Sequence, residues 1–118
     1  MNEIIQVETM PILALRGLAV FPEQTIHFEV GRKKSILALE AAMEGDQTLL
    51  LIPQKDIADD DPNWKALYSI GTVAKVKQIL KAQGETLRVL VTGMYRARID
   101  EPLQSEPYLY LPCLQYPR

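Results

Sequence analysis

Cysteine and histidine are nearly absent from this sequence, which has one of each, Cys113 and His27. A single cysteine cannot form an intramolecular disulfide, so the chain suits a reducing compartment. A metal site needs several clustered ligands, and one cysteine with one histidine does not supply them. His27 alternates with apolar neighbours in a predicted strand, which indicates a structural position. We therefore expect no metal site.

Signatures of catalysis and of phosphate binding are also missing. The six glycines form neither a GxGxxG motif nor a P-loop. No GxSxG motif is present, and the histidine stands in no serine-containing signature. Composition alone leaves a Ser–Lys dyad open, but Ser35, Ser69 and Ser105 lie in no recognisable context. We expect this chain to carry no catalytic residue and to bind no cofactor of its own.

Charge of one sign is not in excess, since 13 basic and 15 acidic residues give a net charge of −2. Nucleic-acid-binding domains usually carry a large basic excess, because neutralising phosphates supplies most of their affinity. RNA binding is therefore disfavoured, although a local basic patch is compatible with this balance.

The densest acidic cluster, Asp56 with residues 59–61, has Pro62 where a calcium loop needs glycine. It predicts a solvated loop.

Long apolar runs are missing too. The longest, residues 49–53, is far shorter than a membrane span of about 20 residues. Residues 1–9 include acids and no run of signal-peptide length. These features predict a soluble cytoplasmic protein. At 118 residues the chain is long enough for one domain, residues 1–118, with its own hydrophobic core.

The clearest pattern that is present lies in residues 85–100. Six of the seven odd-numbered positions are apolar, against two of the even ones, which predicts a strand with one buried face. Gly93 in its middle favours a bulge or bend. Residues 71–81 are the expected partner strand, joined through a turn at residues 83–84 and irregular near residues 77–78.

A helix is predicted over residues 32–44, because apolar residues recur there at helical spacing. Ala38 and Ala41 are expected on its outer side. Gly45 follows at the position of a left-handed C-cap. The stripe expected to face the core consists of Ile36, Leu39, Ala42 and Met43.

Shorter segments complete the predicted fold. Residues 53–63 favour a long loop and residues 64–69 a single helical turn. Prolines confine the last predicted strand to an edge. Together these elements predict an α+β domain. Its five or six strands form a largely antiparallel, curled sheet or partly open barrel, with one main helix. The shorter predicted strands are residues 10–15, 25–30, 48–52 and 108–114.

Two stretches are candidate contact sites for a partner. Residues 18–21 form a short apolar run, which indicates either core burial or a loop that presents a hydrophobic patch. Three cations at the predicted helix start oppose the helix dipole. Either the domain tolerates the small loss of stability that this repulsion causes, or the cations and the free amides at the helix start form a site for acidic protein groups. The candidate contact residues are Leu18, Val20, Phe21, Arg32, Lys33 and Lys34.

A series of short motifs runs through residues 11–99. The motifs are PILALRG (11–17), VFP (20–22), VGR (30–32), ALEAAM (38–43), QKD (54–56), LY (67–68), IGTVA (70–74), QILK (78–81), RVLVTG (88–93) and RARI (96–99). Their order and spacing resemble the amino-terminal domain of Lon-type ATP-dependent proteases. Two departures are Ala14, where that family often has proline, and Thr92, where an acid is common.

The resemblance implies a non-catalytic, PUA-like β-domain. In the family such a domain is followed by helices, an AAA+ ATPase that uses ATP and Mg, and a Ser–Lys serine peptidase. We therefore expect the chain to be a truncated part of a longer protease.

The family's amino-terminal domain helps to select and hold unfolded or damaged proteins and supports assembly of the hexamer. Those are the expected function and partners, with no membrane partner and no nucleic acid. The alternatives are a stand-alone protein of the Lon-substrate-binding type, a PUA-like RNA-binding protein, and an enzyme that acts alone.

Overall fold

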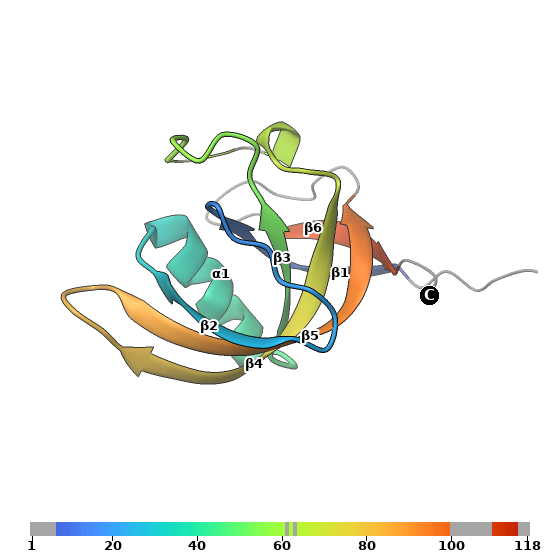
Figure 1. The fold of residues 1–118 in the computed structure, drawn as a ribbon. Coiled ribbons are helices and arrows are strands. Elements are labelled where there is room, and N and C mark those ends of the chain that lie inside the picture. The colour runs from blue at the N-terminus through green and yellow to red at the C-terminus, as the bar shows by residue number, and fades with distance from the viewer. Residues whose placement is uncertain (1–6, 61, 63, 100–109, 116–118) are drawn as a thin grey trace, which may run out of the picture.

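Six strands and one α-helix make up most of the structure (Figure 1). The computed structural model describes residues 7–60, 62, 64–99 and 110–115. Each predicted element is present within a few residues of its expected bounds. The elements are β1 (Val7–Leu15), β2 (Thr25–Val30), α1 (Lys33–Glu44), β3 (Thr48–Pro53), one 3-10 turn (Trp64–Ala66), β4 (Ile70–Lys81), β5 (Leu87–Ile99) and β6 (Tyr110–Gln115).

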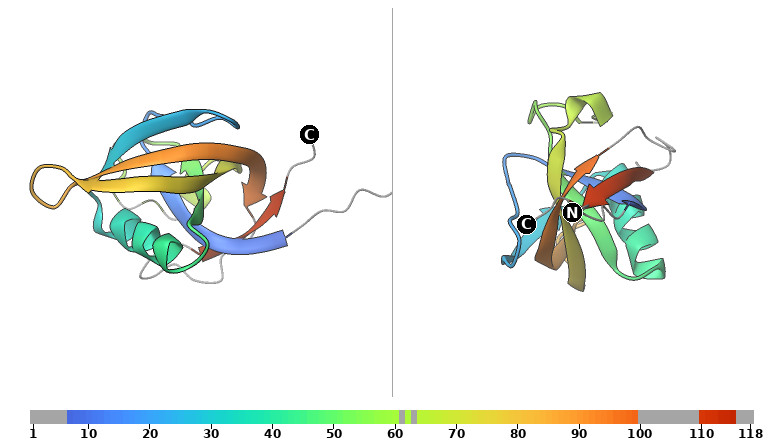
Figure 2. Two further views of the ribbon diagram at one scale, coloured as in Figure 1. Left: turned by 90° about the horizontal axis from the view of Figure 1, so that it is seen from below. Right: turned by 90° about the vertical axis from the view of Figure 1, so that its right-hand side faces the viewer.

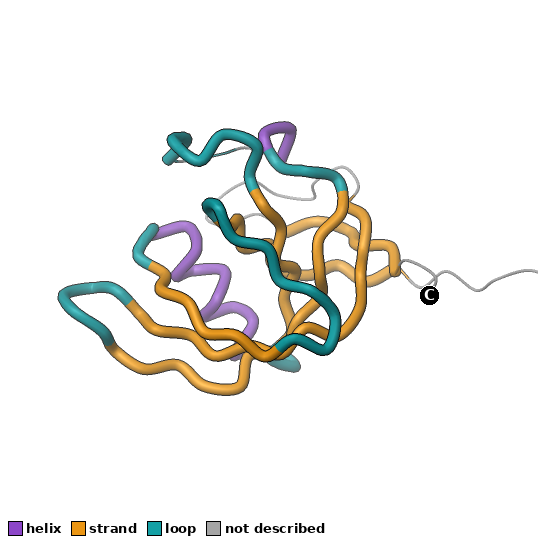
Figure 3. Tube along the Cα trace, in the orientation of Figure 1, coloured by secondary structure: helices purple, strands orange, loops and turns teal. Residues whose placement is uncertain are grey.

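The strands form one sheet in the order β2-β5-β4-β3-β1-β6. The described ladders are antiparallel except that of β1 with β3, which is parallel. A short additional ladder joins residues 97–99 of β5 to residues 113–115 of β6, so the sheet curls back on itself (Figures 2 and 3). The predicted α+β class with a largely antiparallel, curled sheet is therefore confirmed.

The pairing of β6 corrects one prediction. The sequence predicts an edge strand here, but β6 pairs with residues 7–11 of β1 and also with β5. The ladder to β5 uses residues 113–115, which follow Pro112. Because proline has no N–H to donate, it lies outside this second ladder.

The sheet centre, by which we mean residues 9–15 of β1, β3 and residues 70–76 of β4, is buried on both faces. Successive residues of β3 alternate between two apolar clusters. Leu49 and Leu51 lie in a first cluster that includes side chains of α1. Leu50 and Ile52 lie in a second cluster with side chains of β1, β4, β5 and β6. Burial on both faces explains why β3 has four consecutive large aliphatic residues without alternation.

The wing, by which we mean β2, residues 77–81 of β4 and residues 87–92 of β5, buries one face only. Its inner face packs on the first cluster, and its outer face is open to solvent. β2 alternates as predicted, and His27 is exposed on the outer face. The inward residues of β2 are Ile26, Phe28 and Val30.

Two bulges shape the hairpin of β4 and β5. Lys77 is left without a register partner, which confirms the irregularity predicted near residues 77–78. This bulge moves the inward position from even residues such as Val76 to odd residues such as Ile79. In β5 the register skips Met94, directly after Gly93, where the sequence predicts a bulge or bend.

The helix is confirmed, but its rotation differs from the prediction. Ala38 is fully buried and not on the outer side, and Met43 is exposed. The helix is buried through Leu39 and three small side chains, and Met43 lies outside this buried face. The buried residues of α1 are Ser35, Ala38, Leu39 and Ala42.

The end of α1 also differs. Gly45 has φ −102°, which is not left-handed. The left-handed residue is Gln47, with φ 69°. The Gly45 and Gln47 N–H groups both donate to the carbonyl of Ala42, at 3.1 and 2.9 Å. The chain therefore reverses two residues later than predicted. No helix in the described part of the chain is long and apolar enough to cross a membrane.

Candidate functional site

The loop between β1 and β2, residues 16–24, is held firmly against β5. The Gln24 N–H donates to the Phe21 carbonyl oxygen at 3.1 Å and closes a turn. The Glu23 N–H donates to the Gly93 carbonyl oxygen, and the Gly93 N–H donates to that of Gln24, both at 2.8 Å. These bonds fix a turn in which Glu23 has a positive φ of 68°, a conformation that costs a non-glycine residue about 1 kcal/mol.

Two residues of the sheet let the loop lie directly on it. The Thr72 hydroxyl donates to the Val20 carbonyl oxygen at 2.6 Å. A Cβ atom at Gly93 would lie 2.2 Å from the Phe21 carbonyl oxygen, which no side chain tolerates. Glycine at this position of β5 therefore lets the loop lie directly on the strand, and Val20 anchors the loop in the first cluster.

The three apolar candidate residues of this loop differ in how deeply they are buried. Val20 is buried in the first cluster, and Leu18 is half-buried against it. Phe21 leaves 50% of its surface exposed. Burial and exposure, the two alternatives for this run, therefore apply to different residues of it.

The exposed Phe21 ring lies under a cation. The Arg96 guanidinium carbon is 5.5 Å from the ring centroid, within the range of a cation–π contact. Met94, two residues before Arg96, is also exposed. Aromatic, methionine and arginine side chains are the types enriched in protein interfaces.

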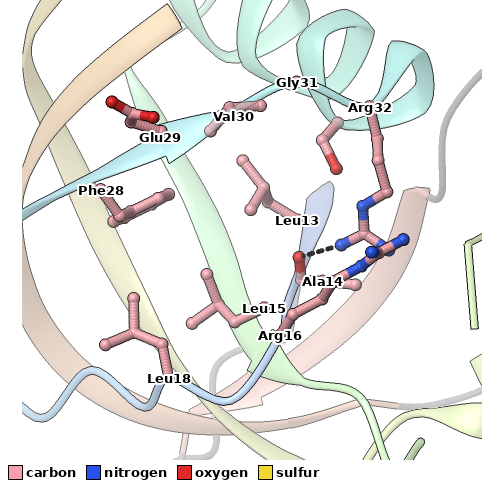
Figure 4. A pocket seen from close by; sticks show the side chains of 11 residues that line it. Leu13, Ala14, Leu15, Arg16, Leu18, Phe28, Glu29, Val30, Gly31 and Arg32 are labelled. Carbon is pink, nitrogen blue, oxygen red and sulfur yellow. Dashed lines mark hydrogen bonds between the residues drawn. The ribbon is translucent and has the colours of Figure 1, made fainter. Parts of the chain in front are cut away.

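A groove of about 380 Å³ opens between β2, the end of β1 and the start of α1 (Figure 4). Its size is within the range of ligand-binding pockets. Arg16, Glu29, Arg32 and Ser35 provide polar groups around it. Its apolar lining consists of Leu13, Leu15, Leu18, Phe28 and Val30.

The three cations at the helix start do not share one environment. Arg32 is half-buried, and its guanidinium donates to the Gln54 Oε1 at 2.8 Å and to the Ala14 carbonyl oxygen at 2.7 Å. Arg32 therefore connects the end of β2 to β1 and to the segment after β3. Lys33 is exposed, and Lys34 is half-buried.

The acidic loop after β3 is tied to the same network. Gln54 is buried, and its Nε2 donates to the carbonyl oxygens of Asp56 and Asp59, both at 2.7 Å. Arg16 donates to the Asp60 carboxylate at 2.6 Å. Among the described residues no group of three metal-ligating side chains comes together. Asp61 of the predicted acidic cluster lies outside the described residues.

Sequence reasoning missed several residues of this region. Arg96, Thr72 and Gln54 belong to matching motifs, but nothing in their spacing indicates contacts across 20 to 75 positions of the chain. The sequence places Phe28 only on the buried face of its strand, and in the structure this residue also lines the groove. Only the tertiary packing brings these side chains together.

Comparison with known proteins identifies the family. The family described as the ATP-dependent protease La (LON) substrate-binding domain matches residues 9–116. Lon protease of Brevibacillus choshinensis is 52% identical over 99 residues, which are 84% of this chain and 13% of that protein. Lon protease of Desulforamulus reducens is 45% identical over 111 residues, which are 94% of this chain and 14% of that protein. The chain thus matches only 13–14% of the length of these relatives.

Two solved structures share the fold. The N-terminal domain of Mycobacterium avium complex Lon protease superposes with a TM-score of 0.75 at 23% identity, over 94% of this chain and 56% of that one. A Lon N-terminal domain protein from Xanthomonas campestris gives a TM-score of 0.66 at 12% identity, over 91% of this chain and 58% of that one. From the family match and these relatives, the chain belongs to the family of substrate-binding domains of the ATP-dependent protease La (LON).

Proposed function

We propose that this domain holds exposed apolar segments of unfolded or damaged proteins for an ATP-dependent Lon protease. The observation that carries the proposal is the loop of residues 16–24, which presents a half-exposed Phe21 ring on a hydrogen-bonded turn. Because the turn is already fixed, binding of a partner to the ring causes no further loss of backbone conformational entropy in the loop. Apolar groups are exposed in unfolded proteins and buried in folded ones, which supplies the selectivity.

The six candidate contact residues take different parts in this proposal. Phe21 and Lys33 are exposed and would touch the bound segment, and Lys34 would lie at the margin. Leu18 would contribute through the groove that it lines. Val20 and Arg32 would act indirectly, Val20 by anchoring the loop and Arg32 by joining β2 to β1.

The relatives are whole proteases, so we extend the proposal to the parent chain. Binding by this domain would be weak, and an AAA+ motor elsewhere in the protease would use ATP and Mg to pull the segment toward a serine peptidase. The domain would also support assembly of a hexamer in the cytoplasm. The chemistry of bond cleavage would lie outside residues 1–118.

The test compares binding of an unfolded and a folded protein. Reduced and carboxymethylated α-lactalbumin stays unfolded and can be labelled for fluorescence anisotropy, with native α-lactalbumin as the folded probe. We expect the unfolded probe to bind at least tenfold more tightly. Phe21→Ala should weaken its binding by roughly fivefold, since burying half of a phenylalanine contributes about 1 kcal/mol.

The matched control is Tyr68→Ala, which removes another aromatic ring that is about half exposed. Equal weakening by both variants, or equal binding of folded and unfolded probes, would contradict the proposal. A labelled RNA added in the same assay at several salt concentrations tests the nucleic-acid alternative. Tight RNA binding with a steep salt dependence would favour that alternative.

A further inference from the structure

β2 forms an outer edge of the sheet. In the strand order it has one neighbour among the described strands, β5, along residues 87–92. The opposite side of β2 therefore carries backbone N–H and C=O groups that no described strand pairs. Such an edge is a template for another extended chain.

The free edge of β2 borders the groove described above. Phe28 and Val30 point from β2 into this space, and Leu15 and Leu18 approach it from β1 and from the loop (Figure 4). Glu29, between them in the strand, lies at the margin of the groove, and its carboxylate is 3.4 Å from the Arg88 guanidinium. In a sheet, side chains of neighbouring strands that share a row point to the same face. A strand added to β2 would thus place every second side chain over the apolar groove.

We propose that an extended segment of unfolded polypeptide pairs with the free edge of β2 and places alternate aliphatic side chains in this groove. The inference deepens the proposed function and rests on it. Backbone pairing is independent of sequence, whereas the groove selects for aliphatic residues at every second position. Folded proteins are disfavoured because most of their backbone groups are already paired.

The size of the edge limits the strength of this binding. β2 has six residues, and short edge strands restrict unwanted pairing. Half of its backbone groups, three N–H and three C=O, face the free side, so about six hydrogen bonds are available, each contributing about 0.5–1.5 kcal/mol. An affinity of this order holds a segment for a time and also allows its release.

The test uses one nonapeptide and two N-methylated versions of it. The probe is acetyl-Lys-Thr-Val-Thr-Val-Thr-Val-Thr-Lys-amide, and the versions carry N-methyl groups on the three valines or on the three threonines that precede them. In an extended chain alternate N–H groups point to opposite edges, so each version blocks one edge. We expect one version to bind this 118-residue chain at least tenfold more weakly than the parent peptide, and the other to bind within about threefold of it.

Hydrogen exchange provides an independent readout on the protein. Amides on the free side of β2 should gain protection when the parent peptide is bound, and those of β6 should not change. Equal binding of all three peptides, or equal loss by both methylated versions, would overturn the pairing. If sedimentation shows a dimer in the absence of peptide, and hydrogen exchange shows that the same β2 amides are protected in it, the occupant of the edge is a second copy and our choice of occupant is wrong.

Variants test the groove separately. Leu18→Asp should weaken the peptide at least tenfold, whereas the control Leu80→Asp, on the exposed outer face of the wing, should leave binding unchanged. Circular dichroism confirms that each variant folds. If the unfolded protein probe still binds through Phe21 while the methylated peptides match their parent, the edge inference fails and the proposed function stands. If the unfolded probe does not bind either, both fail.

Discussion

The sheet centre and the wing belong to one sheet, yet their sequences differ because their surroundings differ. In the centre, β3 has aliphatic residues at four successive positions, and each face of the strand packs on its own cluster. In the wing, β2 alternates, and the outward residues meet solvent. The comparison shows that side-chain pattern reports how many faces of a strand are buried, and that it does not report which strands are its neighbours.

The largest expected effect comes from equal truncations in the two regions. Leu50 in the centre is 0% exposed and Leu80 in the wing 52% exposed. Leu50→Ala should lower the free energy of unfolding by about 2–5 kcal/mol, because it leaves a cavity. Leu80→Ala should change it by about 0.5 kcal/mol or less. Urea unfolding of both variants measures this difference. Equal losses of unfolding free energy would show that the sheet centre and the wing do not differ in burial as described.

The next effect concerns the point where β5 leaves the wing. A methyl group at Gly93 would collide with the backbone of Phe21. Gly93→Ala should therefore destabilise the domain by about 1–3 kcal/mol, the usual cost of overpacking. It should also weaken binding of the unfolded probe, since the loop must move. In Gly31→Ala the added carbon meets only the Thr86 hydroxyl, at 3.5 Å, so unchanged stability is expected there. A neutral Gly93→Ala would show that the loop is not fixed on β5.

Arg32 connects the wing to the sheet centre, so its substitution tests how much this connection contributes to stability. Arg32→Met keeps the length of the side chain and removes its hydrogen bonds to Gln54 and Ala14. We expect a loss of about 2 kcal/mol, since Gln54 is buried and would lose a charged partner. Lys33→Met, one residue later and exposed, is the control and should cost about 0.5 kcal/mol or less. Thermal unfolding of both decides whether the first cation is structural.

The smallest effect is expected at Asp46, an exposed residue just before β3. Hydrogen bonds from the Thr48 hydroxyl and then from the Thr48 N–H hold the pKa of Asp46 below its ordinary value of 3.8. A lowered pKa in the folded state adds stability above pH 3.8, and this is lost as the pH falls through the folded pKa. Thr48→Val should move the pKa back toward 3.8, as followed by NMR titration of the carboxyl carbon. An unchanged pKa would show that the hydroxyl bond contributes nothing.

Much of the fold follows from local patterns. The alternation of residues 85–100, the run in β3 and the helical spacing of residues 32–44 predict the elements correctly, because side-chain period depends on backbone geometry alone. The rotation of α1 does not follow, since Ala38 suits either an exposed or a tightly packed position. For the candidate site, the sequence predicts which residues take part but not how they are arranged. Whether Leu18, Val20 or Phe21 is exposed depends on how the loop lies on β5.

By itself, the sequence determined the types and approximate positions of the elements, the irregularity near residues 77–78, a bulge or bend at Gly93, and the family. The tertiary structure alone decided that β1 runs parallel to β3, that β6 lies between β1 and β5, and that Arg32 turns inward while Phe21 stays exposed. The reason is physical. Local conformation is selected within a few residues, whereas these contacts join positions far apart in the chain and form only where packing offsets the entropy of closing the loop.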